Sequence, residues 1–446
     1  MPDLLDIAEQ VISRALEGEE VEAVVVHERE TEIRGYEGQV ESLTAAESQG
    51  IGVRVVRDDK QGFAYAGSLE EDAVVEVLAE ARDNVDFATP DEYSGLAKPD
   101  GVQVADLDLY WPELVEYPTD AKVSMALELE RLTSQGDTRI TGVESAEYSD
   151  TITEAAVVTT TGIRTTSRET GCCLMVSALA EQDGETQTGF GFSLARDPGG
   201  LDAQQAASDA VIRSTRMLGS VKPSSERLTV ILDPWVCAQF LGIVGATLSG
   251  EMVLKGRSLF ADRLGDSVAA GAVTLIDDPT DPAAFSATAT DGEGLATRRN
   301  VLIENGELKG FVHNSWTARC SGATSTGSAI RGYASTPGVG IQAVSLIPGA
   351  LDPTQLIASV DNGILVQSVT GLHSGVNPIS GDFSTGAEGL RIRNGELAEP
   401  VREFTIGSTI QRMLQDVTGV GNDLVWQPMN AAGLTLVIGE LTMSGA

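Results

Sequence analysis

The chain has 446 residues, 42% of them hydrophobic and 22% charged, which is the balance of a globular protein with a sizeable core. Its 66 acidic and 30 basic residues give a formal net charge of −36 at pH 7. A surface this acidic repels phosphate backbones, so the composition argues against direct binding of nucleic acids.

The acidity itself has two explanations. Of the 30 basic residues, six are Lys and 24 are Arg, and a bias toward acids and Arg is typical of a salt-adapted or high-GC organism. The functional alternative is that the charge attracts basic partners or substrates. We expect a cytoplasmic protein, because no apolar run reaches the roughly 18 residues that cross a bilayer. The N-terminus also carries acids where a secretory signal has basic residues.

The first part of the chain predicts helices around a β-hairpin. In chain order, the expected elements are a helix at about residues 4–16, a strand at 21–26 and hairpin strands at 52–56 and 61–65. Ser68 is the expected N-cap of the next helix, with Glu71 three residues later, and this helix should end near Phe87.

The middle of the chain predicts a helix at about 120–133, antiparallel strands between 139 and 194, and a helix at about 202–218. Adjacent cysteines at Cys172 and Cys173 would point to opposite faces of a strand. Together with Cys237 and Cys320 they form no disulfide framework and lack metal-site spacing. The small, polar segment 220–225 contains Pro and divides the chain into predicted domains 1–220 and 221–446.

The second half opens with a strand at 228–232 and a helix at about 234–248, followed mostly by strands and loops. Asn305-Gly306 and Asn394-Gly395 each lie between alternating segments and predict tight hairpins. Either a duplicated unit or independent turn chemistry explains the repetition. The fold class expected is α+β, with an N-terminal α/β part containing antiparallel strands and a C-terminal part of large mixed or antiparallel sheets.

Residues 371–389 are rich in glycine and in small polar side chains. This composition predicts a long structured loop, because few side chains are available to bury and glycine permits close backbone approach. Such a loop is either a binding site or a solvent-facing connector.

This glycine-rich segment and residues 317–331 resemble the C-terminal half of the TldD/PmbA family, also called modulators of DNA gyrase. Residues 40–55 and the run Gly62-Phe63-Ala64-Tyr65 resemble the opening segment of the same family. The resemblance extends from about residue 5 to residue 440.

Active members of this family resemble zinc metallopeptidases with His-Glu-x-x-x-His on a helix. Two imidazoles hold the ion, and the Glu takes a proton from metal-bound water. By the resemblance, the motif falls on residues 250–255, with Glu251 at the acid position and Gly250 and Lys255 in place of the imidazoles. The chain's three histidines, His27, His313 and His373, are all more than five residues apart. We therefore expect neither a zinc ion nor a catalytic residue in this chain.

Loss of both imidazoles resembles the PmbA/TldE branch, the non-zinc subunit of a heterodimeric protease. The resemblance implies a TldD-like partner that carries the zinc, or else a homodimer, and a peptide as substrate. The predicted substrate-binding residues lie in two segments: His373, Ser374, Asn377, Asp382 and Ser384 in one, and Ser325, Thr326 and Arg331 in the other. The second segment has two interpretations. Its hydroxyls and guanidinium bind a peptide carboxylate, or it is a capped turn with a structural Arg.

Other side chains have ordinary structural interpretations. His313 alternates with Phe311 on a strand-like segment and is expected to be packed or hydrogen-bonded, and His27 to be structural or exposed. The acids Asp277, Asp278 and Asp281 predict a solvated acidic loop more readily than a cation site.

Two further functions compete with the accessory peptidase subunit. The first is an acidic interaction protein that modulates gyrase or another DNA-binding target without hydrolysis. The second is a hydrolase that uses His373 and Ser374, for which the sequence lacks a nucleophile elbow.

Overall fold

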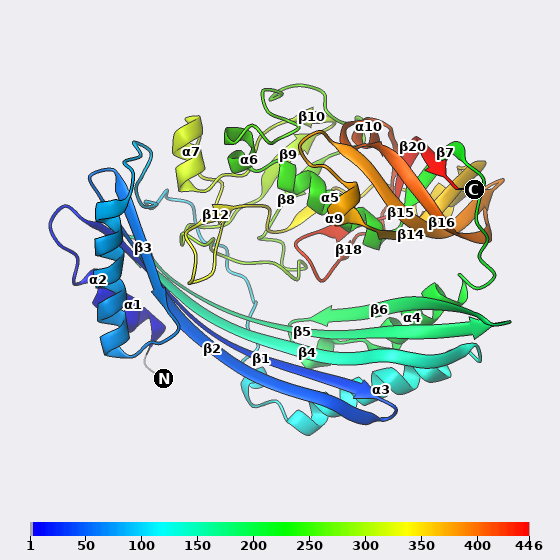
Figure 1. Ribbon diagram of the computed structural model, residues 1–446, viewed down its shortest axis with the longest axis horizontal. Coiled ribbons are helices and arrows are strands. Elements are labelled where there is room, and N and C mark those ends of the chain that lie inside the picture. Colours follow the sequence, from blue (N-terminus) through cyan, green and yellow to red (C-terminus); the bar gives the residue numbers. More distant parts are fainter. Residues whose placement is uncertain (1–2, 446) are drawn as a thin grey trace.

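Two β-rich bodies make up the computed structural model, which describes residues 3–445 (Figure 1). One body is a long curved sheet covered by helices, and the other gathers several smaller sheets and short helices. This arrangement confirms the predicted α+β class. None of the helices in residues 3–445 is long and apolar enough to cross a membrane.

The first body is built on a six-stranded sheet in the order β3-β2-β1-β4-β5-β6, with every neighbouring pair antiparallel. Its strands are β1 (Glu20–Tyr36), β2 (Gln39–Arg57), β3 (Lys60–Ala66), β4 (Ile140–Thr159), β5 (Arg164–Gln182) and β6 (Glu185–Ala195). β2 pairs with β3 only from residue 51 onward, so residues 39–50 form an edge with β1 as their one sheet partner among the described strands.

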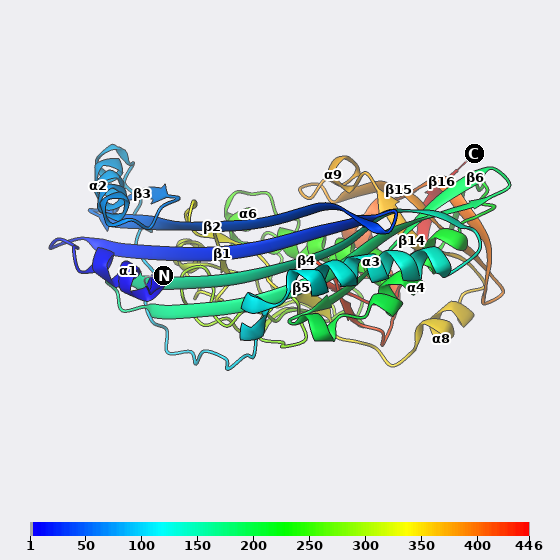
Figure 2. The same ribbon diagram turned by 90° about the horizontal axis from the view of Figure 1, so that it is seen from below.

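Helices cover the face of this sheet that points away from the second body (Figures 1 and 2). They are α1 (Leu4–Ile12), α2 (Glu71–Phe87), α3 (Thr119–Gln135) and α4 (Ala203–Thr215), with short 3₁₀ turns η1 (Pro112–Glu116) and η2 (Pro198–Gly200). α1 and α2 bury one apolar cluster against β1 to β4, and α3 and α4 bury another against β1, β4 and β5. Helix α4 lies so near β6 that a Cβ atom on Gly191 would be 1.9 Å from the Ala206 carbonyl oxygen.

The second body contains a sheet that closes on itself. Its order is β16-β15-β14-β7-β20-β17, and β16 also pairs with β20, so five strands form a ring. The strands are β7 (Glu226–Leu232), β14 (Asn362–Thr370), β15 (Asp382–Arg393), β16 (Glu396–Thr409), β17 (Val417–Val420) and β20 (Leu436–Ser444). β7 and β14 are parallel and the other pairs are antiparallel, which confirms the predicted mixed sheet. Helices α5 (Pro234–Thr247) and α10 (Ile410–Gln415) add to the large apolar core of this body.

Smaller elements complete the second body. A second sheet has the order β10-β9-β8-β13, and two-stranded pairs join β11 with β12 and β18 with β19. The remaining elements are β8 (Leu275–Asp277), β9 (Asn300–Glu304), β10 (Glu307–Leu308), β11 (Ala329–Ile330), β12 (Gly338–Val339), β13 (Val344–Leu346), β18 (Val425–Trp426), β19 (Ala432–Gly433), α6 (Gly250–Leu254), α7 (Ser315–Ser321), α8 (Pro353–Ala358) and α9 (Leu372–Gly375).

All three predicted hairpin turns are confirmed. Asp58 and Asp59 join β2 to β3 with φ of 54° and 60°. Asn305 and Asn394 have φ of 49° and 51°, each followed by a glycine with positive φ, and they join β9 to β10 and β15 to β16. Asn and Gly tolerate this left-handed region with little strain, which is why the turn residues were readable from sequence.

Some predicted boundaries were wrong. The first helix ends at Ile12, because Leu16 is exposed and contributes nothing to the apolar face. The second helix has Glu70 as its N-cap, while the Ser68 hydroxyl accepts the Glu70 N–H just outside it. β1 and β2 are far longer than the predicted strands. The outer part of β2 was missed because residues 39–48 are exposed and lack the alternation of a half-buried strand.

The glycine-rich segment 371–389 is a loop only in its first part. Residues 382–389 belong to β15, which lies between β14 and β16. The prediction was wrong because backbone pairing on both sides holds this strand, and small residues let its neighbours approach. A Cβ atom on Gly389 would lie 1.9 Å from the Leu365 carbonyl oxygen on β14.

A buried ion cluster joins the two bodies. On the sheet, Arg54 of β2 donates to both carboxylate oxygens of Glu22 on β1, at 3.0 and 2.7 Å. From the second body, Arg331 donates to the same Glu22. Arg54 Nη2 also lies 3.6 Å from Glu293 Oε1. We call Glu22, Arg54, Glu293 and Arg331 the buried ion cluster; the side chains of all four are at most 4% exposed.

The cluster is electrically balanced, with two carboxylates and two guanidinium groups. Burial by itself would raise the pKa of Glu22, but the charges of Arg54 and Arg331 outweigh that effect and lower it. Removing one partner would therefore leave a charge in the interior without compensation.

Replacing Arg54 by Leu should destabilise the protein by about 3–5 kcal/mol, because Glu22 and Glu293 would then share one guanidinium. Denaturant unfolding followed by circular dichroism measures the loss. The matched control is Arg131→Leu, which removes a solvent-exposed ion pair with Glu128 on α3 and should change the stability little. Equal effects of the two substitutions would contradict a cluster that holds the bodies together.

Candidate functional site

The segment that resembles the metallopeptidase motif lies at a break between two helices. α5 ends at Thr247, Ser249 bridges to Val312, and α6 starts at Gly250, whose N–H donates to the Val312 carbonyl at 2.8 Å. A Cβ atom at Gly250 would lie 2.3 Å from Nδ1 of His313. The imidazole of His313 thus occupies the space that a side chain at position 250 would need.

His313 is held firmly in this place. It is buried, its Nδ1 lies 3.2 Å from Thr317 Oγ1, and its backbone N–H donates to Thr326 Oγ1 at 2.7 Å. Burial lowers the pKa of this imidazole, which favours its neutral form. The expected packed, hydrogen-bonded histidine is confirmed.

Glu251 and Lys255 form an ion pair one helical turn apart, with Lys255 Nζ 2.5 Å from Glu251 Oε1. The ammonium group of Lys255 is therefore paired with the carboxylate of Glu251. By the resemblance, Glu251 corresponds to the acid of the metallopeptidase motif. Glycine offers no ligand atom and a charged ammonium repels a cation, so these residues do not fit a zinc ion. Residues 3–445 contain no group of three or more His, Cys, Asp or Glu side chains that could hold a metal ion.

The structure brings five of the predicted substrate-binding residues together. His373 and Ser374 on α9, Asn377 in the following turn, and Asp382 and Ser384 at the start of β15 are all exposed. The turn is well braced: the Asn377 side chain accepts the Ile379 N–H at 2.9 Å, and Asp382 accepts the Ser380 hydroxyl at 2.7 Å. The Ser374 hydroxyl donates to the Gly371 carbonyl at 3.2 Å, so it is committed to the turn and not to His373.

His373 also borders a cavity of about 570 Å³, which we call the apolar cavity. It is lined by α5, by α9 with the residues after it, and by residues 341 and 429–431. The side chains are mostly aliphatic: Ile243, Ile341, Leu372, Val376, Pro378 and Met429. Gln239 also lines it, and its buried Oε1 has no hydrogen-bond partner among the described residues. A cavity of this size and character suits an apolar side chain of a ligand.

The remaining three predicted residues lie elsewhere. Ser325 and Thr326 are bonded to the backbone of His313, whose carbonyl accepts the Ser325 hydroxyl at 3.3 Å and the Thr326 N–H at 3.0 Å. Arg331 belongs to the buried ion cluster, which agrees with the alternative of a structural Arg. None of these three lines the apolar cavity with His373.

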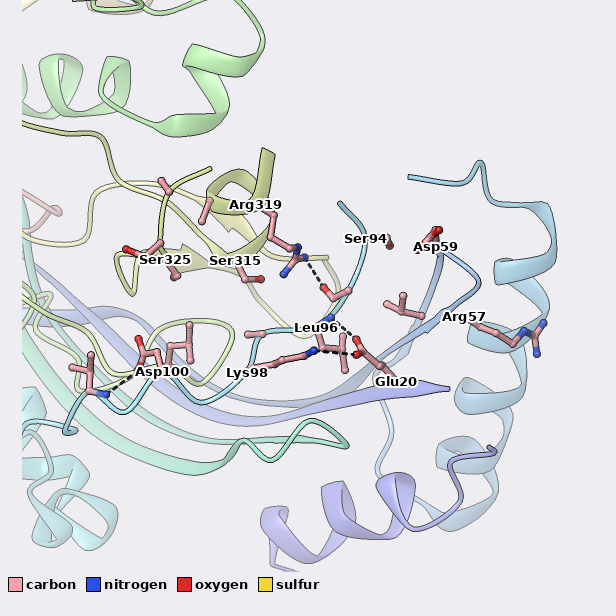
Figure 3. Close-up of a pocket in the computed structure, with 18 of the residues that line it drawn as sticks. Glu20, Arg57, Asp59, Ser94, Leu96, Lys98, Asp100, Ser315, Arg319 and Ser325 are labelled. Carbon is pink, nitrogen blue, oxygen red and sulfur yellow. Dashed lines mark hydrogen bonds and ion pairs between the residues drawn. The ribbon is translucent and has the colours of Figure 1, made fainter. Parts of the chain in front are cut away.

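Ser325 instead lines a polar cavity of about 690 Å³ between the two bodies (Figure 3). Charges of both signs line it, and two of its guanidinium groups are hydrogen-bonded within the chain. Arg319 of α7 donates to the Tyr93 and Gly95 carbonyls at 2.7 and 2.8 Å, and Arg298 donates to Asp100 at 2.6 Å. These hydrogen bonds connect the segment after α2 to the second body along the polar cavity.

The acids at 277–281 hold turns. Asp277 is buried and accepts the N–H groups of Gln342 and Ala343 at 2.8 and 2.7 Å, so the predicted solvated loop was wrong for this residue. Asp278 and Asp281 accept backbone N–H groups two residues ahead.

His27 is buried within β1, where its Nε2 lies 2.6 Å from Glu47 Oε1.

Asp291 is a buried acid beside the ion cluster that sequence patterns did not single out. It accepts N–H groups from Glu293, Leu295 and Ala329 at 2.9 to 3.0 Å. Burial, and then the charge of Glu293, raise the pKa of Asp291 to about 7.

Family models match almost the whole chain. The models for the PmbA/TldA metallopeptidase domain 1, central domain and C-terminal domain match residues 21–85, 112–218 and 225–445. The Escherichia coli O157:H7 protein named metalloprotease PmbA is 25% identical, over 98% of this chain and 96% of its own length. A metalloprotease of Methanothermobacter thermautotrophicus is 27% identical, over 87% of this chain and 84% of its own length.

Solved structures share the fold. A Thermotoga maritima protein described as a candidate modulator of a DNA gyrase has a TM-score of 0.91 and 26% identity, covering 98% of this chain and 99% of that one. TldE from Thermococcus kodakarensis has a TM-score of 0.89 and 24% identity, with 99% of both chains covered. At 24% identity, the similarity to TldE is a similarity of fold.

Replacing Gly250 by Ala should cost about 1–3 kcal/mol, because its Cβ would collide with the His313 ring. Combining Gly250→Ala with His313→Ala should cost clearly less than the sum of the single substitutions. Gly242→Ala is the control, since a Cβ there meets nothing within 4 Å and helix α5 should gain slightly. Additive losses in denaturant unfolding would show that His313 does not fill the space at residue 250.

The raised pKa of Asp291 predicts a pH dependence of stability. The unfolded carboxyl ionises near 3.8 and the folded one only near 7, so the folded state holds an extra proton between these values. The contribution of Asp291 to the free energy of unfolding is therefore complete below about pH 4 and is lost as pH rises toward 7.

Unfolding of the native chain and of Asp291→Asn should be measured from pH 4 to 8. The difference between the two curves should fall with pH by at most about 1.4 kcal/mol per unit and level off above 7. Asp137→Asn is the control: hydrogen bonds from Arg139 lower the pKa of Asp137 to about 2, so its effect lies below this range. A flat difference curve for Asp291→Asn would contradict the raised pKa.

Proposed function

Because this chain belongs to the PmbA/TldD metallopeptidase family, we propose that it is the PmbA/TldE-like, non-catalytic subunit of a two-subunit peptidase. Its partner would be a TldD-like chain that carries the zinc ion. The chain would help to hold peptides or unfolded proteins while the partner cleaves them.

The observation that carries this proposal is the replacement at residues 250–255. Gly250 makes room for His313 and Lys255 forms an ion pair with Glu251, so the segment lacks a pair of imidazoles and its carboxylate already has a partner. A hydrolytic zinc site needs protein ligands and a base for its water, whereas Gly250 and Lys255 supply no ligand here and Glu251 is paired with Lys255.

Peptide holding is supported by the apolar cavity and the exposed turn beside it. The cavity offers room for an apolar side chain, and His373, Asn377 and Asp382 next to it offer polar contacts to a main chain. We therefore propose these residues as substrate contacts.

Pairing with another subunit is supported by the edge of the first sheet. Residues 39–48 of β2 are exposed, and among the described strands they pair with β1 alone. Leu43 and Val40 are apolar side chains on this edge, 46% and 41% exposed. Long exposed edges invite another chain, so we place a subunit contact here. Relatives named as TldD homologues supply the class of partner.

A gyrase modulator is the second candidate, favoured by the net charge of −36 and by the description of the Thermotoga maritima relative. Charge-driven association weakens steeply with ionic strength, because salt screens exposed charges. A pull-down of gyrase subunits at several salt concentrations, without any peptide cleavage, would favour this function.

The proposal predicts that the purified chain alone cleaves no peptide. Mixed with the TldD-like chain from the same genome, it should co-elute in gel filtration and give cleavage of unfolded casein that a chelator abolishes. Leu43→Lys should weaken co-elution, because it places a charge on the proposed contact edge.

The control is Leu264→Lys, at a side chain that is 63% exposed in the second body, which should leave the complex intact. Chelator-sensitive cleavage by the lone chain would defeat the proposed division of labour. So would full activity of the partner without this chain.

A further inference from the structure

A third cavity, of about 420 Å³, lies between the inner face of the first sheet and the second body. We call it the sheet cavity. Its floor consists of side chains that are direct cross-strand neighbours: Val24 faces Val157 across β1 and β4, and Ala155 faces Ser167 across β4 and β5. The small side chains of Ala155 and Ser167 leave room above the strands.

The opposite wall carries three buried polar atoms that have no hydrogen-bond partner among the described residues: Ser286 Oγ, Gln342 Oε1 and Arg331 Nη2. Buried polar atoms are nearly always paired, so three unpaired atoms around one cavity indicate a polar occupant. The Arg331 side chain is 1% exposed, so bulk solvent does not satisfy it.

The other bonds of these residues fix what each can offer. Arg331 donates Nη1 to Glu22 and Nε to the Ser335 carbonyl at 3.1 Å, which leaves Nη2 as a donor on a guanidinium whose charge is already balanced. Gln342 donates Nε2 to the Ala329 carbonyl at 3.3 Å, which leaves Oε1 as an acceptor. Ser286 supplies a hydroxyl that either donates or accepts.

One donor and one acceptor match a peptide unit, which presents a C=O and an N–H. A free carboxylate fits less well, because Glu169 and Asp291 also line the cavity and the Arg331 charge is shared with Glu22. The volume lies within the roughly 300–1,000 Å³ of small-ligand sites, and the small floor residues favour a ligand with short side chains.

We propose that the sheet cavity binds the main chain of a short, extended peptide with small side chains. Arg331 Nη2 donates to a peptide carbonyl, Gln342 Oε1 accepts a peptide N–H, and the Ser286 hydroxyl bonds the next polar atom of the chain. This assignment rests on the proposed role in handling peptides and adds a second contact region, distinct from the apolar cavity.

Calorimetric titration of the purified full chain with N-acetyl-trialanine amide tests the proposal, since this probe has peptide units and no charged ends. Saturable binding at one site is expected. Ser286→Ala and Gln342→Leu should each weaken it by about threefold to tenfold, the effect of one lost hydrogen bond. Arg331 is left unchanged because it holds the buried ion cluster.

Ser286→Ala removes a hydroxyl that has no partner in the described structure, so its fold should be preserved, as a thermal unfolding midpoint will verify. The matched control is Ser124→Ala on α3, whose hydroxyl donates to the Asp120 carbonyl on the exposed side of the sheet's helical layer. Its affinity for the probe should equal that of the native chain.

Three results would overturn the assignment: no binding of the probe at millimolar concentration, unchanged affinity in both cavity variants, or a crystal structure with the probe in which only water occupies the cavity. Each would leave the proposed function standing, because the titration uses the lone chain and involves no zinc-bearing partner. Conversely, absence of partner-dependent cleavage would leave the measured peptide affinity intact.

Discussion

The buried ion cluster is the interaction on which the arrangement of this molecule depends. Glu22 and Arg54 come from adjacent strands of the first sheet, whereas Glu293 and Arg331 come from the second body. Four desolvated charges cost much of what their attraction returns, so the cluster gives geometry more than stability. Its directional bonds set one position of the sheet against the second body. The polar cavity and the sheet cavity both lie along this junction, and their shapes follow from it.

Steric packing explains the structure of residues 250–255. Glycine at 250 permits the imidazole of His313 to pack against the start of α6, and His313 in turn orders Thr317 and Thr326 by hydrogen bonds. A neutral, buried imidazole and a Glu251–Lys255 ion pair are stable without any cation. The side chains of this segment are therefore already engaged in packing and in an ion pair within the chain.

Local chemistry explains how much could be predicted from the sequence. Helix α3, helix α4 and the Asn-Gly hairpins follow from periodicity and turn residues, which are properties of short segments. The long outer parts of β1 and β2 are held by pairing with each other and carry no burial pattern to read. The contact of Arg331 with Glu22 spans 309 residues, so no local signal assigns this Arg to a buried cluster. The exposed turn at 371–381 was recognisable from composition, whereas the apolar cavity beside it depends on how α5 and α9 meet.

Binding and bond cleavage place different demands on a fold, and our proposal assigns them to different subunits. Cleavage by a metal needs two or three ligand atoms at fixed distances, and one glycine or one lysine in the wrong place removes it. Binding a peptide needs a shaped surface with a few donors and acceptors, which many side chains supply together. The apolar cavity lies on α5, and α6 with Gly250 follows directly in the chain, so the proposed peptide surface and the position without imidazole ligands are neighbours in sequence. In the proposed complex, this chain would hold the substrate while the zinc-bearing partner would carry out the reaction.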